Sequence, residues 1–260
     1  MKDYRIREYQ YSDIPALQAL WQSVFGDPPV LLERFFVLLP HMGTCCLAEA
    51  DGCIVGAAYI LNDFLLRNPG QRDQRCSYLY AVAAEESWRG NGIGRAVSVG
   101  AADMGRQAGA EIICTLPAEL SLYDWYSSIL DLNFVSKRFL YYSPNHTLLH
   151  DDFFAALSPV TEEYYLQRRE ELLQNVPHVV PGNTVFSFQN ELCHTFGGGI
   201  YQWKDSLLCA YEDEGNVKIV EFLSADPAPP FWLLRHPEKQ RYVCSDIRLP
   251  DDTVWNLTLD

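Results

Sequence analysis

The sequence has no long hydrophobic run. No stretch approaches the roughly 18 apolar residues that a membrane-spanning helix needs. The first residues, Met1 to Arg5, also lack the apolar segment of a secretory signal peptide. We therefore expect no membrane partner and a cytoplasmic location.

Motifs that bind metals or form disulfide scaffolds are also missing. The chain has eight cysteines, but no two of them are spaced as CxxC, and its six histidines form no HExxH motif. Cysteines such as Cys114 lie within apolar runs, which is typical of buried free thiols. We expect no metal cofactor and no disulfide scaffold.

Positive charge is scarce. The chain has 20 Lys and Arg residues against 34 Asp and Glu residues, a net charge of −14. A phosphate backbone repels such a chain unless basic residues gather on one face. The densest basic clusters, at Arg67 to Arg75 and at Arg168-Arg169, do not alternate with aromatic residues as in a base-stacking groove. Nucleic acid is therefore not an expected partner, whereas a cationic amine would be attracted.

The apolar content is sufficient for a substantial core. Hydrophobic residues make up 48% of the 260 residues and charged residues 21%, and this length suits two domains of about 100–200 residues each. Over the first 142 residues, hydrophobic periodicity and turn residues predict the order β-α-α-β-β-β-α-β-α-β, a mixed α/β layout. The expected helices are Ile14–Val24, Val30–Leu39 (ended by Pro40), Gly92–Gln107 and Ser121–Leu130, and the expected strands are Tyr4–Tyr9, Cys45–Ala50, Ile54–Leu66, Ser77–Ala83, Glu111–Leu116 and Phe134–Tyr142.

The pattern changes at Pro144-Asn145-His146, where we place a domain boundary. The expected domains are residues 1–143 and residues 144–260. The second is predicted to be a smaller α+β domain, with one helix from Thr161 to about Gln174 followed by a β-meander. Its expected strands are Val185–Phe188, Ile200–Trp203, Leu207–Tyr211, Val217–Leu223 and Tyr242–Cys244.

A glycine-rich loop is the most informative segment. The strand that ends near Ala84 is followed by Arg89-Gly90-Asn91-Gly92-Ile93-Gly94-Arg95, which opens directly into a helix. Glycines allow positive φ and close approach of the backbone to a ligand. Their N–H groups and those of the first helical turn form a concave anion site, which the helix dipole reinforces. The loop therefore predicts phosphate binding.

Two common phosphate loops do not fit this segment. A P-loop ends in Gly-Lys-Ser/Thr, whereas Gly94 is followed by Arg95-Ala96. A dinucleotide fingerprint has the spacing G-x-G-x-x-G, whereas the spacing here is G-x-G-x-G. The segment Arg89–Gly94 resembles the Arg/Gln-x-x-Gly-x-Gly/Ala pyrophosphate loop of the GCN5-related N-acetyltransferases (GNAT), and the element order up to residue 142 is similar to that family.

The resemblance implies an acyl-CoA N-acyltransferase fold, with a central mixed sheet flanked by helices. The C-terminal domain loosely resembles a degenerate second unit of the same kind. The implied activity is an N-acetyltransferase, in which the amine of a small-molecule or peptide acceptor attacks acetyl-CoA directly. The strand residues Val82, Ala83 and Ala84 would bind the pantetheine, with an N–H near Val82 facing the thioester carbonyl. The implied pyrophosphate-binding residues are Arg89, Gly90, Asn91, Gly92, Ile93, Gly94 and Arg95.

The catalytic residues match the family less closely. The family's general acid is a tyrosine four residues before a Gly-Phe pair; here Asn133-Phe134 takes the place of that pair, and Ile129 holds the expected position. An insertion of three residues would bring Tyr126 into place, and Tyr123 is the second choice.

The general base is open between Asp63, Glu119, the terminal carboxylate of Asp260 and water. The departures from the family pattern leave a second interpretation, a catalytically inactive acyl-CoA-binding or regulatory module.

Overall fold

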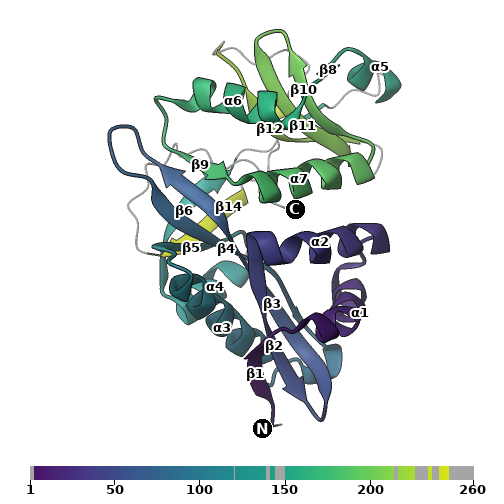
Figure 1. Ribbon diagram of the computed structural model, residues 1–260, viewed down its shortest axis with the longest axis vertical. Coiled ribbons are helices and arrows are strands. Elements are labelled where there is room, and N and C mark those ends of the chain that lie inside the picture. The colour runs from purple at the N-terminus through teal and green to yellow at the C-terminus, as the bar shows by residue number, and fades with distance from the viewer. Residues whose placement is uncertain are drawn as a thin grey trace. The chain divides into compact units, whose positions relative to one another are not determined.

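Figure 1 shows a computed structural model of the chain, which describes residues 3–119, 121–138, 141–143, 150–213, 216–225, 234–235 and 240–245. The chain divides into two compact units, the first mainly from residues 3–66 and 73–135 and the second mainly from residues 136–241. Residues 141–143, which the predicted boundary placed in the first domain, thus group with the second unit. The division into domains 1–143 and 144–260 stays a prediction.

The first unit is a mixed β-sheet with helices on both faces. The sheet order is β1-β2-β3-β4-β5-β14-β6, and β4 and β5 run parallel whereas β1 to β4 pair antiparallel. The elements are β1 (Arg5–Glu8), α1 (Ile14–Phe25), α2 (Pro29–Met42), β2 (Gly43–Ala50), β3 (Cys53–Arg67), β4 (Gln74–Ala84), α3 (Ile93–Gln107), β5 (Ile112–Thr115), α4 (Ser121–Leu130), β6 (Leu132–Arg138) and β14 (Gln240–Ser245).

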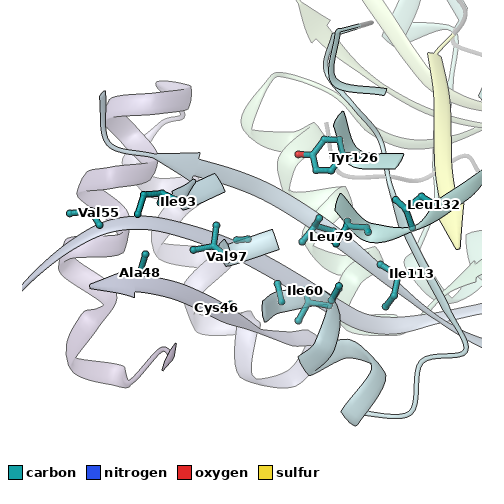
Figure 2. Close-up of a cluster of buried hydrophobic side chains, with 14 of the residues drawn as sticks. Cys46, Ala48, Val55, Ile60, Leu79, Ile93, Val97, Ile113, Tyr126 and Leu132 are labelled. Carbon is teal, nitrogen blue, oxygen red and sulfur yellow. The ribbon is translucent and has the colours of Figure 1, made fainter. Parts of the chain in front are cut away.

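Both faces of this sheet are buried. In Figure 1, α1 and α2 lie on one side of the strands and α3 and α4 on the other. On the first face, Trp21 of α1 and Phe35 of α2 pack on each other and on Tyr59 of β3, with ring centroids 4.8 to 5.2 Å apart. On the second face, an aliphatic cluster joins the strands to α3 and α4 (Figure 2). Burial of apolar side chains on both faces explains why the central strands read as near-continuous apolar runs.

One glycine sets the position of the α3 N-terminus. A Cβ atom at Gly56 of β3 would lie 2.2 Å from Cγ2 of Ile93, the first residue of α3. The helix can therefore start directly against the sheet only because residue 56 has no side chain. This close contact holds the glycine-rich loop beside the end of β4.

The second unit has its own antiparallel sheet, in the order β13-β7-β12-β11-β10-β8. Its elements are β7 (Tyr141–Ser143), α5 (His150–Ala155), β8 (Ser158–Pro159), α6 (Glu162–Leu173), β9 (His178–Pro181), α7 (Asn183–Thr195), β10 (Gly199–Trp203), β11 (Ser206–Asp213), β12 (Asn216–Leu223) and β13 (Leu234–Arg235). The predicted helix after Thr161 is confirmed, and the Thr161 side chain caps it by accepting a hydrogen bond from the N–H of Tyr164.

The mixed fold and the element order of the first 142 residues are as predicted, but several details differ. The C-terminal half has helices α5 and α7 besides α6, rather than one helix, and the predicted strand Tyr242–Cys244 belongs to β14, which pairs with β5 in the first sheet and not with a C-terminal meander. Helix α2 does not end at Pro40 but continues to Met42. The predicted strand Val185–Phe188 is wrong, because these residues belong to helix α7. The predicted strand Phe134–Tyr142 is instead two strands, β6 and β7, which belong to different sheets.

Candidate functional site

The site begins with an open backbone edge at the end of strand β4. β4 pairs with β5 only through Cys76, Ser77 and Tyr78, whereas its pairing with β3 continues to Ala84. In the part of the chain that the structure describes, Ala83 and Ala84 pair with β3, and residues 82–84 have no strand partner on the β5 side. An extended ligand can hydrogen-bond to such an edge as an added strand would.

A β-bulge lies immediately before this edge. Tyr59 pairs with Tyr80 and Ala57 pairs with Ala83, so Ala81 and Val82 together lie opposite one residue of β3. Ala81 has a φ of +47°, in the left-handed region. A bulge bends its strand and turns the following backbone groups, as is common next to active sites. No feature of the sequence indicates this bulge, because alanine rarely adopts positive φ.

The glycine-rich loop then presents N–H groups at the start of α3. Gly90 and Gly92 have φ values of +78° and +83°, so both take the left-handed conformation that glycine permits. The N–H of Ala96 is bonded to the carbonyl of Gly92, and the preceding N–H groups of Ile93, Gly94 and Arg95 have no intrahelical acceptor. Three backbone donors and the positive end of the helix dipole therefore point out of one helix terminus.

A hollow of about 290 Å³ lies over this terminus. Its lining includes six of the seven loop residues that the sequence analysis assigned to the pyrophosphate, and one of the three strand residues assigned to the pantetheine. Its lining residues are Ala84, Trp88, Arg89, Gly90, Gly92, Ile93, Gly94, Arg95 and Trp125. Arg89 and Arg95 are exposed, and neither forms an ion pair with any described residue. The hollow thus combines backbone donors with two guanidinium groups, the chemistry that a diphosphate requires.

Three predicted residues lie outside the lining of the hollow. The Asn91 side chain donates hydrogen bonds to the carbonyls of Trp88 and Arg89, so it braces the loop from within. Ala83 is buried, and Val82 packs partly against the core cluster of Figure 2. Trp88 and Trp125, by contrast, line the hollow although the sequence analysis did not select them.

The two candidate acids lie on α4. Tyr126 is 7% exposed and belongs to the core cluster, where Figure 2 draws its ring above Leu79. Burial raises the pKa of Tyr126 to about 12. Its hydroxyl therefore stays protonated at neutral pH, and it forms no hydrogen bond with another described residue. Tyr123 is half-buried and packs against the same cluster. Neither tyrosine lines the hollow over the α3 terminus.

The candidate bases are dispersed. Asp63 is half-buried on β3, and Glu119 is exposed and accepts a hydrogen bond from the Ser121 hydroxyl. Asp260 lies outside the described residues. Among the residues that the structure describes, no group of His, Cys, Asp and Glu side chains is arranged to hold a metal ion. Within the same residues, no helix combines the length and apolar character needed to cross a membrane.

Comparison with known proteins gives one family-model match, to part of the chain. Residues 10–127 match the model of the acetyltransferase (GNAT) family, whereas no curated protein sequence matches the chain significantly.

Solved structures are similar over most of the chain, although sequence identity is low. A GCN5-related N-acetyltransferase from Kribbella flavida is 14% identical with a TM-score of 0.65, and the match covers 93% of this chain and 71% of that one. One from Anabaena variabilis is 12% identical with a TM-score of 0.65, covering 93% and 72%. A protein from Pyrococcus horikoshii is 12% identical with a TM-score of 0.64, covering 100% and 95%. At such identities the likeness shows a shared fold.

Proposed function

Because residues 10–127 form a domain of the acetyltransferase (GNAT) family, we propose that this chain is an N-acetyltransferase. It transfers the acetyl group of acetyl-CoA to the amine of a small-molecule or peptide acceptor. Coenzyme A is released as the second product, and no metal takes part.

The observation that carries this proposal is the anion site at the start of α3. The free N–H groups of Ile93, Gly94 and Arg95 and the guanidinium groups of Arg89 and Arg95 face one hollow. In this proposal they bind the diphosphate of coenzyme A. The nucleotide and the pantetheine arm then extend from opposite ends of the bound diphosphate. Because the diphosphate is held in place, positioning the thioester costs less entropy.

The open edge of β4 holds the pantetheine arm. Backbone groups of Val82, Ala83 and Ala84 pair with the amides of the arm, and the bulge at Ala81 turns an N–H near Val82 toward the thioester carbonyl. That N–H stabilises the negative charge that develops on the carbonyl oxygen during attack. The strand thereby both aligns and polarises the reacting group.

The chemical step needs proton transfers at the amine and at the sulfur, and no covalent enzyme intermediate. The acceptor loses a proton to water or to a carboxylate such as Asp63 or Glu119, and its neutral nitrogen attacks the thioester carbon. A C–N bond forms as the C–S bond breaks, and the departing sulfur takes the hydroxyl proton of Tyr126. The nitrogen then gives up its second proton, which returns through water to the Tyr126 phenolate. Tyr126 suits this role because its raised pKa keeps it protonated at neutral pH. Tyr123 is the second candidate.

Thiol release from acetyl-CoA in the presence of an amine panel tests the activity. The panel contains alkylamines, polyamines and peptides with free N-termini, and a matched set of N-acetylated panel members serves as the control. The proposal expects acceptor-dependent release of one thiol per acetylated amine, identified by mass spectrometry. Binding of CoA without turnover on any class of amine would contradict an enzymatic role.

Burial of the proposed acid favours one alternative, a catalytically inactive acyl-CoA-binding or regulatory module. Tyr126 is packed in the core and does not line the hollow. In that case the loop would still bind CoA, and Tyr126→Phe would leave the affinity for CoA unchanged. The two functions therefore share the cofactor site and differ in turnover.

A further inference from the structure

We propose that Trp125 forms the apolar wall that holds the pantoyl segment of coenzyme A, a role that the glycine-loop motif does not include. The inference rests on the proposed function, since it concerns the same cofactor site. It makes affinity for coenzyme A depend on a side chain of α4 as well as on the loop.

Trp125 reaches the diphosphate site from a different element. The indole lines the hollow together with Ala84 of β4 and Arg95 of α3. A Cβ atom at Gly94 would lie 3.6 Å from the Cζ2 and Cη2 atoms of the indole, so the six-membered ring lies directly beside the first turn of α3. That is the turn whose N–H groups are free to bind an anion.

The structure of coenzyme A determines which part of the ligand meets this ring. A carbon bearing two methyl groups follows the diphosphate after a single methylene. When the diphosphate lies on the N–H groups of α3, those methyl groups reach the space beside the same turn. On the way to the β4 edge, this segment passes Ala84, which also lines the hollow. Ala84 and Trp125 therefore offer apolar surface to the apolar segment of the ligand.

The indole is suited to such a contact. It is half-buried against the core cluster, so one part is fixed by packing and another borders the hollow. Its ring packs edge-on against Tyr126, with centroids 4.7 Å apart. Covering the remaining indole surface with methyl groups removes apolar area from water on both partners. Only a ligand that carries the pantoyl segment obtains this additional binding free energy.

Two ligands separate this contact from diphosphate binding. Coenzyme A and adenosine 3′-phosphate 5′-diphosphate share the nucleotide and the diphosphate, but only the first has the pantetheine arm. We would measure the Kd of each by calorimetry for the parent chain, for Trp125→Leu and for Trp203→Leu. Trp203 is a control tryptophan of the second unit, where Lys204 Nζ lies 4.4 Å from its ring.

Trp125→Leu is expected to weaken coenzyme A binding about tenfold, as for loss of one well-covered aromatic contact, and to leave the Kd of the nucleotide diphosphate within about twofold. Trp203→Leu should change neither. Equal weakening of both ligands, or no weakening of either, would overturn the assignment. If Trp125→Leu does not fold, Trp125→Phe is measured in its place, with a smaller selective loss expected and the same outcomes counting against the proposal.

Failure of the proposed function gives a different pattern. A parent chain that binds neither ligand would overturn the cofactor site and the role of Trp125 together. A parent that binds both ligands, with a ratio of Kd values that Trp125→Leu does not change, would overturn the role of Trp125 alone.

Discussion

Single glycines in the loop differ in what they contribute, and backbone angles explain the difference. Gly92 has a φ of +83°, and the N–H groups that follow it depend on this conformation for their direction. Gly94 lies two residues on, inside α3, and a Cβ there would make only ordinary contact with Trp125 at 3.6 Å. The two residues therefore form a matched pair for substitution.

Gly92→Ala is expected to lower the free energy of unfolding by about 1–2 kcal/mol, because an L-residue is strained in the left-handed region. It should also weaken CoA binding, since relief of the strain turns the N–H groups away from the ligand. Gly94→Ala should keep the unfolding free energy within about 0.5 kcal/mol of the parent value. Urea unfolding and calorimetry measure both effects. Equal results for the two variants would contradict the assignment of the loop.

Tyr126 permits a test that separates catalysis from packing. Its hydroxyl forms no hydrogen bond with any described residue, so Tyr126→Phe keeps the packing of the ring and breaks no such bond. We expect unchanged or slightly greater resistance to urea, together with a kcat about 100-fold lower, as for loss of a general acid. Tyr123→Phe is the control, with kcat near the parent value. A parental kcat in Tyr126→Phe would remove this residue from the mechanism.

The pH dependence follows from the same side chain. Since burial raises the pKa of Tyr126 from 10.0 to about 12, the phenol remains a proton donor throughout the neutral range. The rate should rise with pH as the acceptor amine loses its proton, without a decline from tyrosine ionisation below about pH 10. The neutral Tyr126 side chain contributes fully to folding stability below pH 10. This contribution is lost as the pH rises further, because the phenol ionises less readily in the folded chain than in the unfolded chain. A descending limb near neutral pH that Tyr126→Phe removes would contradict this account.

Helix α6 and strand β12 are joined by a fully buried ion pair. Arg169 Nε donates to Glu221 Oε1 at 3.1 Å, and Arg169 Nη1 donates to the Val179 carbonyl at 2.8 Å. The Tyr165 hydroxyl donates to the other Glu221 oxygen at 2.9 Å. Both charged side chains are 0% exposed, so each is the main compensation for burying the other.

Glu221→Gln should destabilise the second unit by about 3 kcal/mol, because it removes the nearer carboxylate from the buried Arg169 and leaves the more distant Glu170, 3.8 Å from Nη1. Glu171→Gln is the matched control. Its carboxylate pairs with Arg168 at 2.8 Å on an exposed helix face, where removal of an ion pair has little effect. Urea unfolding followed by far-UV circular dichroism distinguishes them. Similar curves for the two variants would show that the buried pair adds no more stability than an exposed one.

Helix α7 shows where reading elements from the sequence failed. Val185 to Phe188 has the alternation and β-forming residues of a strand, yet the buried residues of α7 also repeat with helical spacing: Val185, Phe186, Phe188, Gln189, Leu192 and Cys193. The helical spacing of apolar residues extends to residue 193, so it indicates the secondary structure of this segment better than the short alternation does. Helix α2 continues past Pro40 because this proline lies in the last turn, where it removes one hydrogen bond, while Leu39 and Met42 are both buried.

One part of the site could be predicted from local sequence, whereas another part depends on tertiary packing. Arg89 to Arg95 could be predicted because a strand end, a glycine loop and a helix start are contiguous in the sequence. The bulge at Ala81 and the indole of Trp125 could not, because they depend on the register of β4 on β3 and on the packing of α4 beside α3. The position of Tyr126 came from the family resemblance, and its packing in the core belongs to the fold.

The molecule as a whole carries a net charge of −14, which should influence the choice of acceptor. A negative surface raises the local concentration of cations, and salt screens this attraction. For a polyamine acceptor, KM should therefore rise about threefold or more between 20 and 200 mM salt. For an amine that is uncharged at the assay pH, KM should change little. Equal salt dependence for the two acceptors would show that the net charge has no part in acceptor binding.

The anion site at the start of α3 is the central claim, and equilibrium binding of coenzyme A tests it most directly. Calorimetric titration would compare the parent chain, the double variant Arg89→Glu/Gly92→Asp and Gly94→Ala. The account predicts CoA binding by the parent and by Gly94→Ala, and a Kd at least about 100-fold higher for the double variant, in which two carboxylates oppose the diphosphate. Retention of the parental Kd in a folded double variant would contradict the account.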